Sequence, residues 1–474
     1  MANIPSAQDP DDDGHTSDDS HCDATLNPTQ TLLTGWQNNG NSTKSNGEMD
    51  KLANLIQRPE FQVSELQGYS AHTANAKITQ ADENWDYNKL KDSFLETSVD
   101  IEVPSGDKNI PSKVFSIPGL LYRRPLSVIR AAFASRLANQ FHYTPFRLFQ
   151  TSESPDGSDN DVQRVHTDIY NSDAFIQEHY RVLRAPTDDP DCKREKVVAA
   201  LMCWSDATQL ANFGTAKLWP IYMLFGNLSK YIRASPNSGA VNHLAYIPSI
   251  PDSIKHEISM FHTKWKTQSK EIITHCSREL YHAIWRYLLD DEFIHAYRYG
   301  IVIKCFDGVE RRIYPRFFTY SADYPEKVLL AAIREQGLCV CPRCLCPKTL
   351  LDQMGTRRDL KLRMKKLRNF LVDKVTTARE YIYRKGYGIR SVYVEGLLKA
   401  TSSVPTMNAF VERLGVDFDI SRMLAPNFMH EFELGVFKAL FAHLIRVLYA
   451  RDSRLIELLD HRYVVSCVLF SHES

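Results

Sequence analysis

The chain has 474 residues, which is enough for two or three domains and a large buried core. Its apolar fraction of 43% and aromatic fraction of 11% exclude a chain that is disordered throughout. The 57 basic and 57 acidic residues cancel, so only local basic patches are left for contact with nucleic acid.

The first 46 residues are rich in Asp, Asn, Ser and Thr, and we expect a disordered acidic tail there. No secretory signal is expected, because no positive segment is followed by an apolar one. The late apolar stretch from Val436 to Ala450 is interrupted by charges and is too short to span a bilayer. The pattern predicts a soluble, intracellular protein with a mixed region at 47–190 and a core at 191–474.

Three strands are predicted in the first half of that core. The run Val197–Trp204 is continuously apolar and stops at Ser205 and Asp206, as expected of a buried central strand that ends in a carboxylate. Leu218–Phe225 and His243–Pro248 are two further strands, and each carries a proline that favours an edge or terminal position.

The second half of the core combines a hairpin with helices. Residues 253–293 have helical spacing, and two strand-like runs flank the turn at Asp307 and Gly308. The second run leads to Asp323, and Pro325 fits the first turn of a following helix. A long helix is expected over 427–450. The order of these elements indicates an α/β (α+β) fold.

Acidic residues stand where phosphodiester chemistry would need them. Asp206 and Asp323 each end a predicted strand, and Glu431 and Glu433 lie on the late helix. Two Mg²⁺ ions held roughly 4 Å apart by carboxylates can activate an attacking oxygen and stabilise a leaving one. From spacing alone, the favoured interpretation is that the two aspartates cap or turn the chain.

Five longer motifs, in order, closely resemble the Plavaka transposases of fungi, which are relatives of CACTA-type elements. They are CWSDATQLANFGTAKLWPIY from Cys203, FGNLSKY from Phe225, RFFTYSADYPEK from Arg316, CPRC from Cys341 and MHEFELGVFK from Met429. The similarity extends from about residue 160 to about residue 460. Several long matches in the same order are far more specific than any single motif.

The resemblance implies an RNase H-like catalytic core with a DDE triad that binds Mg²⁺ or Mn²⁺. It also implies cleavage and transfer of double-stranded DNA at transposon ends, in the nucleus. Carried over by position, the triad would be Asp206, Asp323 and Glu433, with Glu431 as the alternative. Residues two apart on a helix face different ways, so only one of the glutamates can join the site. The chain departs from its relatives at Asn427, where an aspartate is common.

A cysteine-rich insertion at 339–346 predicts a zinc-knuckle-like element. Cys341 and Cys344 have the spacing with which two thiolates hold one Zn²⁺. Cys339, Cys346 and His430 are possible further ligands, and relatives carry a similar insert at this place. The alternative is that these cysteines are small buried residues.

A basic segment at 357–390 is predicted to form a helix with one apolar face. Its first part would contact DNA phosphates, and the alternative is a solvated basic surface. The residues proposed for DNA contact are Arg357, Arg358, Lys361, Arg363, Lys365, Lys366 and Arg368.

Three functions are compatible with these patterns. The first is an active DDE transposase, whose oligomeric state is open, a homo-oligomer included. The second is an inactive remnant that binds DNA or protein, which Asn427 and an expected C-terminal truncation favour, since relatives continue beyond the last motif. The third is an RNase H-like nuclease that does not transpose.

Overall fold

The computed structural model describes residues 28–37, 46–71, 94–152, 161–209 and 217–470. These belong to two compact units, Met1–Asn88 and Lys89–Ser474, each of which is considered by itself. Most of the expected acidic tail, at 1–27 and 38–45, lies outside the described residues. No helix in the described ranges is long and apolar enough to cross a membrane.

The first unit contains α1 (Pro28–Gln37), α2 (Asn46–Ile56) and the 3-10 helix η1 (Val63–Leu66). Helix α1 falls within the range that the sequence assigns to the tail. Thr29 is buried, and its hydroxyl accepts a hydrogen bond from the Gln62 amide at 2.9 Å. The same hydroxyl donates to the carbonyl of Glu60 at 3.3 Å, so α1 is fastened to the segment before η1.

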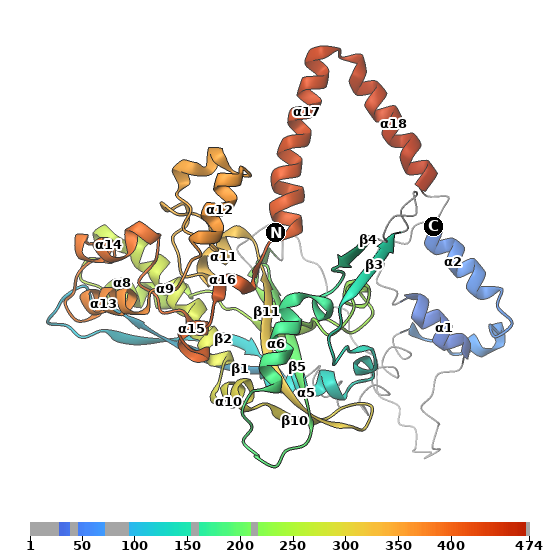
Figure 1. Ribbon diagram of the computed structural model, residues 1–474, viewed down its shortest axis with the longest axis horizontal. Coiled ribbons are helices and arrows are strands. Elements are labelled where there is room, and N and C mark those ends of the chain that lie inside the picture. The colour runs from blue at the N-terminus through green and yellow to red at the C-terminus, as the bar shows by residue number, and fades with distance from the viewer. Residues whose placement is uncertain (1–27, 38–45, 72–93, 153–160, 210–216, 471–474) are drawn as a thin grey trace, which may run out of the picture. The chain divides into compact units, whose positions relative to one another are not determined.

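The second unit is built on a mixed sheet of eight described strands, in the order β1-β2-β9-β8-β5-β11-β10, with β12 beside the carboxyl end of β11. Figure 1 labels β5 and β11, the two central parallel strands. The protein is 48% helix and 19% strand, which confirms the expected mixed α/β class. The strands of this sheet are β1 (Leu95–Val103), β2 (Lys113–Tyr122), β5 (Glu195–Ser205), β8 (Pro220–Phe225), β9 (Asn242–Tyr246), β10 (Ile301–Lys304), β11 (Glu310–Ser321) and β12 (Leu424–Ala425). Two small hairpins are β3 (Leu148–Ser152) with β4 (Asp161–Val165), and β6 (Thr208–Gln209) with β7 (Lys217–Leu218).

The strand predictions are confirmed where local sequence decides them. Strand β5 covers the apolar run that ends at Ser205, and β10 and β11 pair antiparallel about the Asp307-Gly308 turn. Gly308 has φ of 80°, a backbone conformation that glycine adopts without strain. Pro220 is the first residue of β8, and β8 lies in the middle of the sheet. Of the two positions predicted for this proline, it therefore takes the end of a strand and not an edge strand.

Helices cover both faces of the sheet. Val197 and Leu201 of β5 join a large core with Trp285 of α9, whereas Val198 packs with Phe175 of α6 on the other face. Alternate residues of one strand therefore enter two hydrophobic layers, as a fully buried central strand requires. The helices of this unit are α5 (Pro125–Ala134), α6 (Asp173–Leu183), α7 (Lys230–Ala234), α8 (Asp252–Phe261), α9 (Trp265–Leu288), α10 (Asp291–Tyr299), α11 (Tyr324–Leu330), α12 (Arg357–Lys365), α13 (Val372–Tyr383), α14 (Val392–Leu398), α15 (Ala409–Leu414), α16 (Ile420–Met423), α17 (Lys438–Arg451) and α18 (Arg454–Phe470), with the short 3-10 helices η2 (Arg136–Gln140), η3 (Ile169–Asn171), η4 (Lys348–Gln353) and η5 (Lys399–Thr401).

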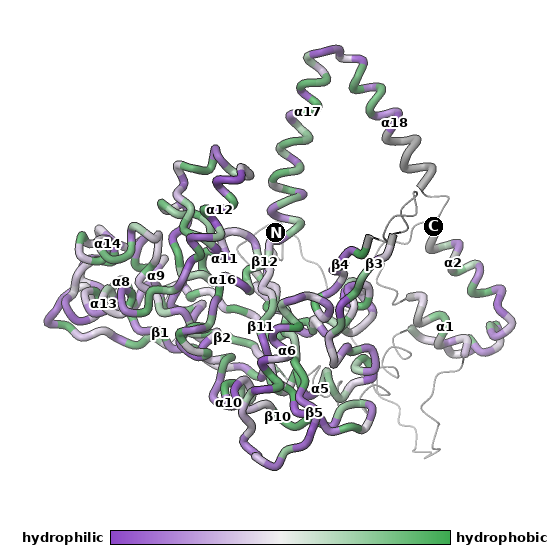
Figure 2. Tube along the Cα trace, in the orientation of Figure 1, coloured by the Kyte–Doolittle hydropathy of each residue, from purple (hydrophilic) through white to green (hydrophobic). Residues whose placement is uncertain are grey.

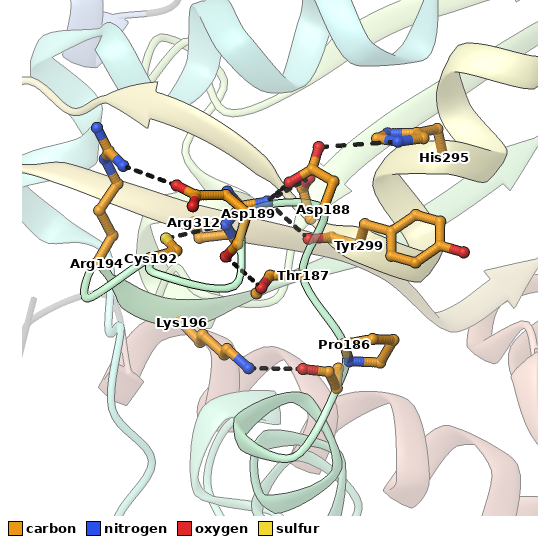
Figure 3. Close-up of polar contacts among 12 residues, drawn as sticks. Pro186, Thr187, Asp188, Asp189, Cys192, Arg194, Lys196, His295, Tyr299 and Arg312 are labelled. Carbon is orange, nitrogen blue, oxygen red and sulfur yellow. Dashed lines mark hydrogen bonds and ion pairs between the residues drawn. The ribbon is translucent and has the colours of Figure 1, made fainter.

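The loop before β5 fixes one end of the central strands (Figure 3). Arg312 of β11 is buried, donates to the carboxylate of Asp188 and donates to the carbonyl of Tyr299 at 3.0 Å. Lys196, which lies opposite Arg312 in β5, donates to the carbonyl of Ala185 at 2.6 Å. These contacts hold the amino-terminal ends of β5 and β11 and leave their carboxyl ends to carry Asp206 and Asp323.

The helix predicted over 427–450 begins where expected, but its first part is a π-helix and not an α-helix. Residues Phe428–Phe437 form the π-helix η6, and α17 continues it. Neither element buries a side chain among the described residues, and Figure 2 shows apolar residues recurring along α17.

The predicted basic helix over 357–390 is wrong as one continuous element. Helix α12 ends at Lys365, and α13 begins only at Val372. The break is caused by Arg368, which is 5% exposed and donates to the carbonyls of Cys339 and Cys341. A buried guanidinium needs such acceptors, and they outweigh the local helical spacing.

His282 makes the stability of this fold depend on pH. It is buried in α9, accepts a hydrogen bond at Nδ1 from the Ala409 amide at 3.2 Å and donates from Nε2 to the Leu329 carbonyl at 3.0 Å. Protonation of Nδ1 would direct its new N–H group at the N–H of Ala409, so the folded state disfavours the charged imidazole. Burial lowers the pKa of His282 to about 4, and it lowers the pKa of the buried His275 similarly.

We expect the free energy of unfolding to fall as the pH falls from about 6.5 to about 4. In that interval His282 becomes protonated in the unfolded chain but stays neutral in the folded protein. This difference lowers the free energy of unfolding by about 3 kcal/mol for this residue. Urea unfolding followed by tryptophan fluorescence should show a shallower pH dependence in His282→Gln, by up to about 1.4 kcal/mol per pH unit. Equal slopes in the two proteins would refute this explanation.

Candidate active site

Two aspartates lie at the same edge of the sheet. Strands β5 and β11 run parallel side by side (Figure 1). Within this pair of strands, Trp204 lies opposite Ser321. Asp206 and Asp323 each follow two residues after that pair, so both leave the sheet at the carboxyl ends of neighbouring strands. Both side chains are half-buried. Clefts at the carboxyl ends of parallel strands are where open α/β sheets bind ligands.

Asp323 also caps a helix, as expected when only its spacing in the sequence is considered. It is the N-cap of α11, and its Oδ1 accepts a hydrogen bond from the Glu326 amide at 2.9 Å. Pro325 stands in the first turn of that helix, which confirms its predicted place. The cap fixes the orientation of the carboxylate. Within the described part of the chain, no hydrogen bond to Oδ2 of Asp323 is seen.

A third carboxyl group lies behind the two aspartates. Glu326 is 4% exposed, accepts hydrogen bonds from the Ser205 hydroxyl and from Trp219 Nε1, the latter at 3.0 Å. Burial raises its pKa to about 7, and the nearby charges of Asp323 and Asp206 also raise it, against the lowering effect of the two hydrogen bonds.

Sequence reasoning missed Glu326. Three residues after an N-cap, a glutamate ordinarily turns back to the cap as part of a surface capping box. Here the side chain turns inward to a serine and a tryptophan that are distant in sequence. The signal that could have found it is a glutamate next to the second aspartate of a motif whose other residues are mostly apolar or aromatic.

The two candidate glutamates of η6 have different surroundings. Glu431 accepts from the ammonium group of Lys327, whose side chain is 5% exposed and lies in α11, four residues after Asp323. Glu433 is exposed. Asn427 caps η6 by accepting from the His430 amide at 3.0 Å, so His430 stands at a helix start.

The carboxylates do not form a closed ligand set. Among the residues that the structure describes, no three side chains of His, Cys, Asp or Glu lie close enough together to hold one metal ion. Asp206 and Asp323 share an edge of the sheet, whereas Glu431 is held by Lys327.

The cysteine-rich insertion shows a pair of thiols and two separate ones. Cys341 and Cys344 lie close enough to interact, and this interaction lowers the pKa of the Cys341 thiol and raises that of Cys344. Cys339 contacts the carbonyls of Leu345 and Ala400, and Cys346 contacts Asp359. The described residues thus supply two neighbouring thiols but no complete set of zinc ligands.

The basic residues proposed for DNA contact divide into two groups. Arg363 pairs with Asp359 at 2.8 Å, and Arg368 is buried under the cysteine-rich insertion. Both are therefore occupied within the fold. The exposed members are Arg357, Arg358, Lys361, Lys365 and Lys366.

Comparison with known families supports the resemblance seen in the motifs. No curated protein matches the chain. The family described as Plavaka transposase matches residues 85–445, a range that includes the sheet, both aspartates, the cysteine-rich insertion and Glu431. Since the match covers well over half of the sequence, the chain belongs to the Plavaka transposase family.

Proposed function

We propose that this chain is a DDE transposase that cuts and joins double-stranded DNA at transposon ends with Mg²⁺ or Mn²⁺. The observation that carries the proposal is the parallel pairing of β5 with β11, which delivers Asp206 and Asp323 to one edge in the same register. Family membership implies DNA as the substrate. We propose a nuclear location, which is consistent with a transposase acting on DNA.

An RNase H-like core agrees with the order of the strands. Strands β9, β8 and β5 are antiparallel, and β11 and β12 follow on the other side of β5 as parallel strands. An antiparallel trio followed by a parallel pair is the sheet we expect of an RNase H-like fold. Its first and fourth strands in chain order would carry the two aspartates.

The side chains fit a divalent metal in part. Two carboxylates at one edge are hard oxygen ligands of the kind that Mg²⁺ prefers, and Mg²⁺ keeps several waters when bound. Bound there, the ion would supply Lewis-acid activation of the attacking oxygen and stabilisation of the leaving oxygen. Asp323 is oriented for this by its cap, and Asp206 by the end of a buried strand.

We assign the role of the glutamate to Glu431, whereas the sequence favoured Glu433. Glu431 reaches α11 through Lys327, and α11 begins at the cap formed by Asp323. Glu433 is exposed on η6. The Lys327 ammonium group pairs with Oε1 of Glu431, and we propose that Glu431 exchanges this contact for the metal when the ion binds.

A strand-cleavage assay tests the function. The purified chain is incubated with a duplex that carries the ends of its own element, with Mg²⁺, with Mn²⁺ or with EDTA. Metal-dependent nicking followed by joining of the freed 3′ ends is the expected result. Binding without nicking would contradict the proposal and favour the DNA-binding remnant, and nicking without joining would favour the nuclease.

The exposed basic residues of α12 are expected to bind DNA phosphates. Removing one lysine that neutralises a phosphate should reduce the slope of log K against log salt concentration by about 0.9. Lys361→Ala with Lys365→Ala should therefore lower the slope by about 2 in a fluorescence anisotropy titration. The matched control is Lys193→Ala with Lys304→Ala, which removes two exposed lysines near the other end of the central strands. Equal slopes for the two double variants would show that α12 does not bind DNA.

A further inference from the structure

Glu326 is a buried carboxyl group to which the proposed reaction gives no role. Burying a carboxyl group is costly unless hydrogen bonds compensate. The Ser205 hydroxyl donates to Oε1, Trp219 Nε1 donates to Oε2 at 3.0 Å, and the Tyr281 hydroxyl reaches Oε1 at 3.5 Å. The Tyr320 hydroxyl extends this network, since it lies 2.8 Å from the Ser205 hydroxyl and 3.1 Å from that of Tyr281.

These contacts join the two chain segments that carry the aspartates. Ser205 is the residue before Asp206. The amide of Glu326 is the group that Asp323 caps. One residue is therefore bonded through its side chain to the end of β5 and through its backbone to the second aspartate.

Glu326 does not join the two aspartates as a third ligand in this arrangement, because no three such side chains among the described residues lie close enough together to hold one ion. Each carboxylate oxygen already accepts a hydrogen bond from a neighbouring side chain, and only 4% of the residue is exposed. Its contacts instead connect Glu326 to Ser205, next to Asp206, and to the helix that Asp323 caps.

We propose that Glu326 is a positioning residue that sets the separation of Asp206 and Asp323 and thereby the affinity of the site for its divalent metal. This inference rests on the proposed function, because it requires that the two aspartates bind the metal. Partners that orient metal ligands typically contribute 10–100-fold to metal affinity.

The test is the binding of Mn²⁺ to the full chain, measured by electron paramagnetic resonance. Glu326→Ala should weaken Mn²⁺ binding by at least about tenfold. Glu326→Gln should restore most of the affinity, because the amide oxygen can accept from Trp219 while the amide nitrogen donates to the Ser205 hydroxyl. The matched control is Glu335→Ala, an exposed glutamate shortly after α11, which should bind Mn²⁺ as the wild type does.

A second readout separates positioning from a general loss of structure. In the cleavage assay, Glu326→Ala should raise the Mn²⁺ concentration for half-maximal rate about tenfold and leave DNA binding unchanged. Should Glu326→Ala fail to fold, Glu326→Gln and Glu326→Asp carry the comparison, and an unshifted Mn²⁺ dependence in Glu326→Asp would overturn the proposal.

The possible failures can be told apart. If Glu326→Ala folds and binds Mn²⁺ as tightly as the wild type, the positioning role is overturned while the function stands. If Glu326→Gln loses as much affinity as Glu326→Ala, the hydrogen bonds are not what positions the site, and the proposal is again overturned. If Asp206→Asn binds Mn²⁺ as the wild type does, the metal site itself is wrong and both proposals fall.

Discussion

Replacing Asp206 by asparagine is expected to reduce metal-dependent DNA cleavage about a thousandfold while the protein still folds and binds DNA. Asparagine keeps the size of the side chain and removes the charge that would attract the metal. A bound ion contributes several kcal/mol of transition-state stabilisation, and a loss of about 4 kcal/mol corresponds to about a thousandfold in rate. Asp206 stands at the end of β5 and is half-buried, so its replacement disturbs no core packing.

The measurement is single-turnover cleavage of end-labelled duplex at saturating Mg²⁺. Asp189→Asn is the matched control, because Asp189 lies in the loop that holds the other end of β5 (Figure 3). It should cleave within about twofold of the wild-type rate, as a surface substitution does. Cleavage by Asp206→Asn at the wild-type rate would remove Asp206 from the active site.

The second large effect is expected at Glu431. Glu431→Gln should reduce cleavage by at least about a hundredfold, and Glu433→Gln should change the rate by less than about threefold. The difference follows from the position of each residue on η6. Glu431 accepts from the buried Lys327 in α11, whereas Glu433 is exposed.

The two variants control for each other, since they make the same change two residues apart on one helix. Glu433→Gln should keep the wild-type thermal unfolding midpoint within about 2 °C, because Glu433 is exposed. Glu431→Gln should lower the midpoint, because it leaves the buried ammonium group of Lys327 without its carboxylate partner. Cleavage is therefore compared well below both midpoints. A large loss in Glu433→Gln with an intact Glu431→Gln would restore the assignment that the sequence favoured. Equal rates in all three proteins would exclude both glutamates.

The sequence predicts those parts of the fold that short-range rules decide. Strand β5 follows from an apolar run that ends in a polar pair, and the β10–β11 hairpin follows from Asp307 and Gly308. The start of α11 follows from Asp323 and Pro325. Each of these depends on residues within a few positions of one another, so no knowledge of the tertiary structure is needed.

Features that depend on distant partners could not be predicted in this way. The spacing of Leu360, Met364 and Leu367 favours one long helix, yet all three are exposed, and the chain turns at Lys366. Arg368 goes inward because the carbonyls of the cysteine-rich insertion receive it. No local pattern specifies that insertion as its partner.

In the candidate site, too, the residues specified by local sequence could be predicted, and those that depend on distant partners could not. Asp206 and Asp323 could be found because each ends a strand, and the motifs of the family select them among 57 acidic residues. Which of Glu431 and Glu433 faces the aspartates depends on how η6 is rotated. The role of Glu326 depends on Ser205 and Trp219, which precede it by more than one hundred residues.

Anomalous diffraction from a crystal of the full chain soaked in Mn²⁺ tests the central claim most directly. We predict a peak about 2 Å from carboxylate oxygens of both Asp206 and Asp323, at the carboxyl ends of β5 and β11. In the presence of DNA ends, Glu431 should have left Lys327 and joined the ion. A saturated crystal with its only strong peak elsewhere, or with Asp206 and Asp323 bound to no common ion, would contradict the claim.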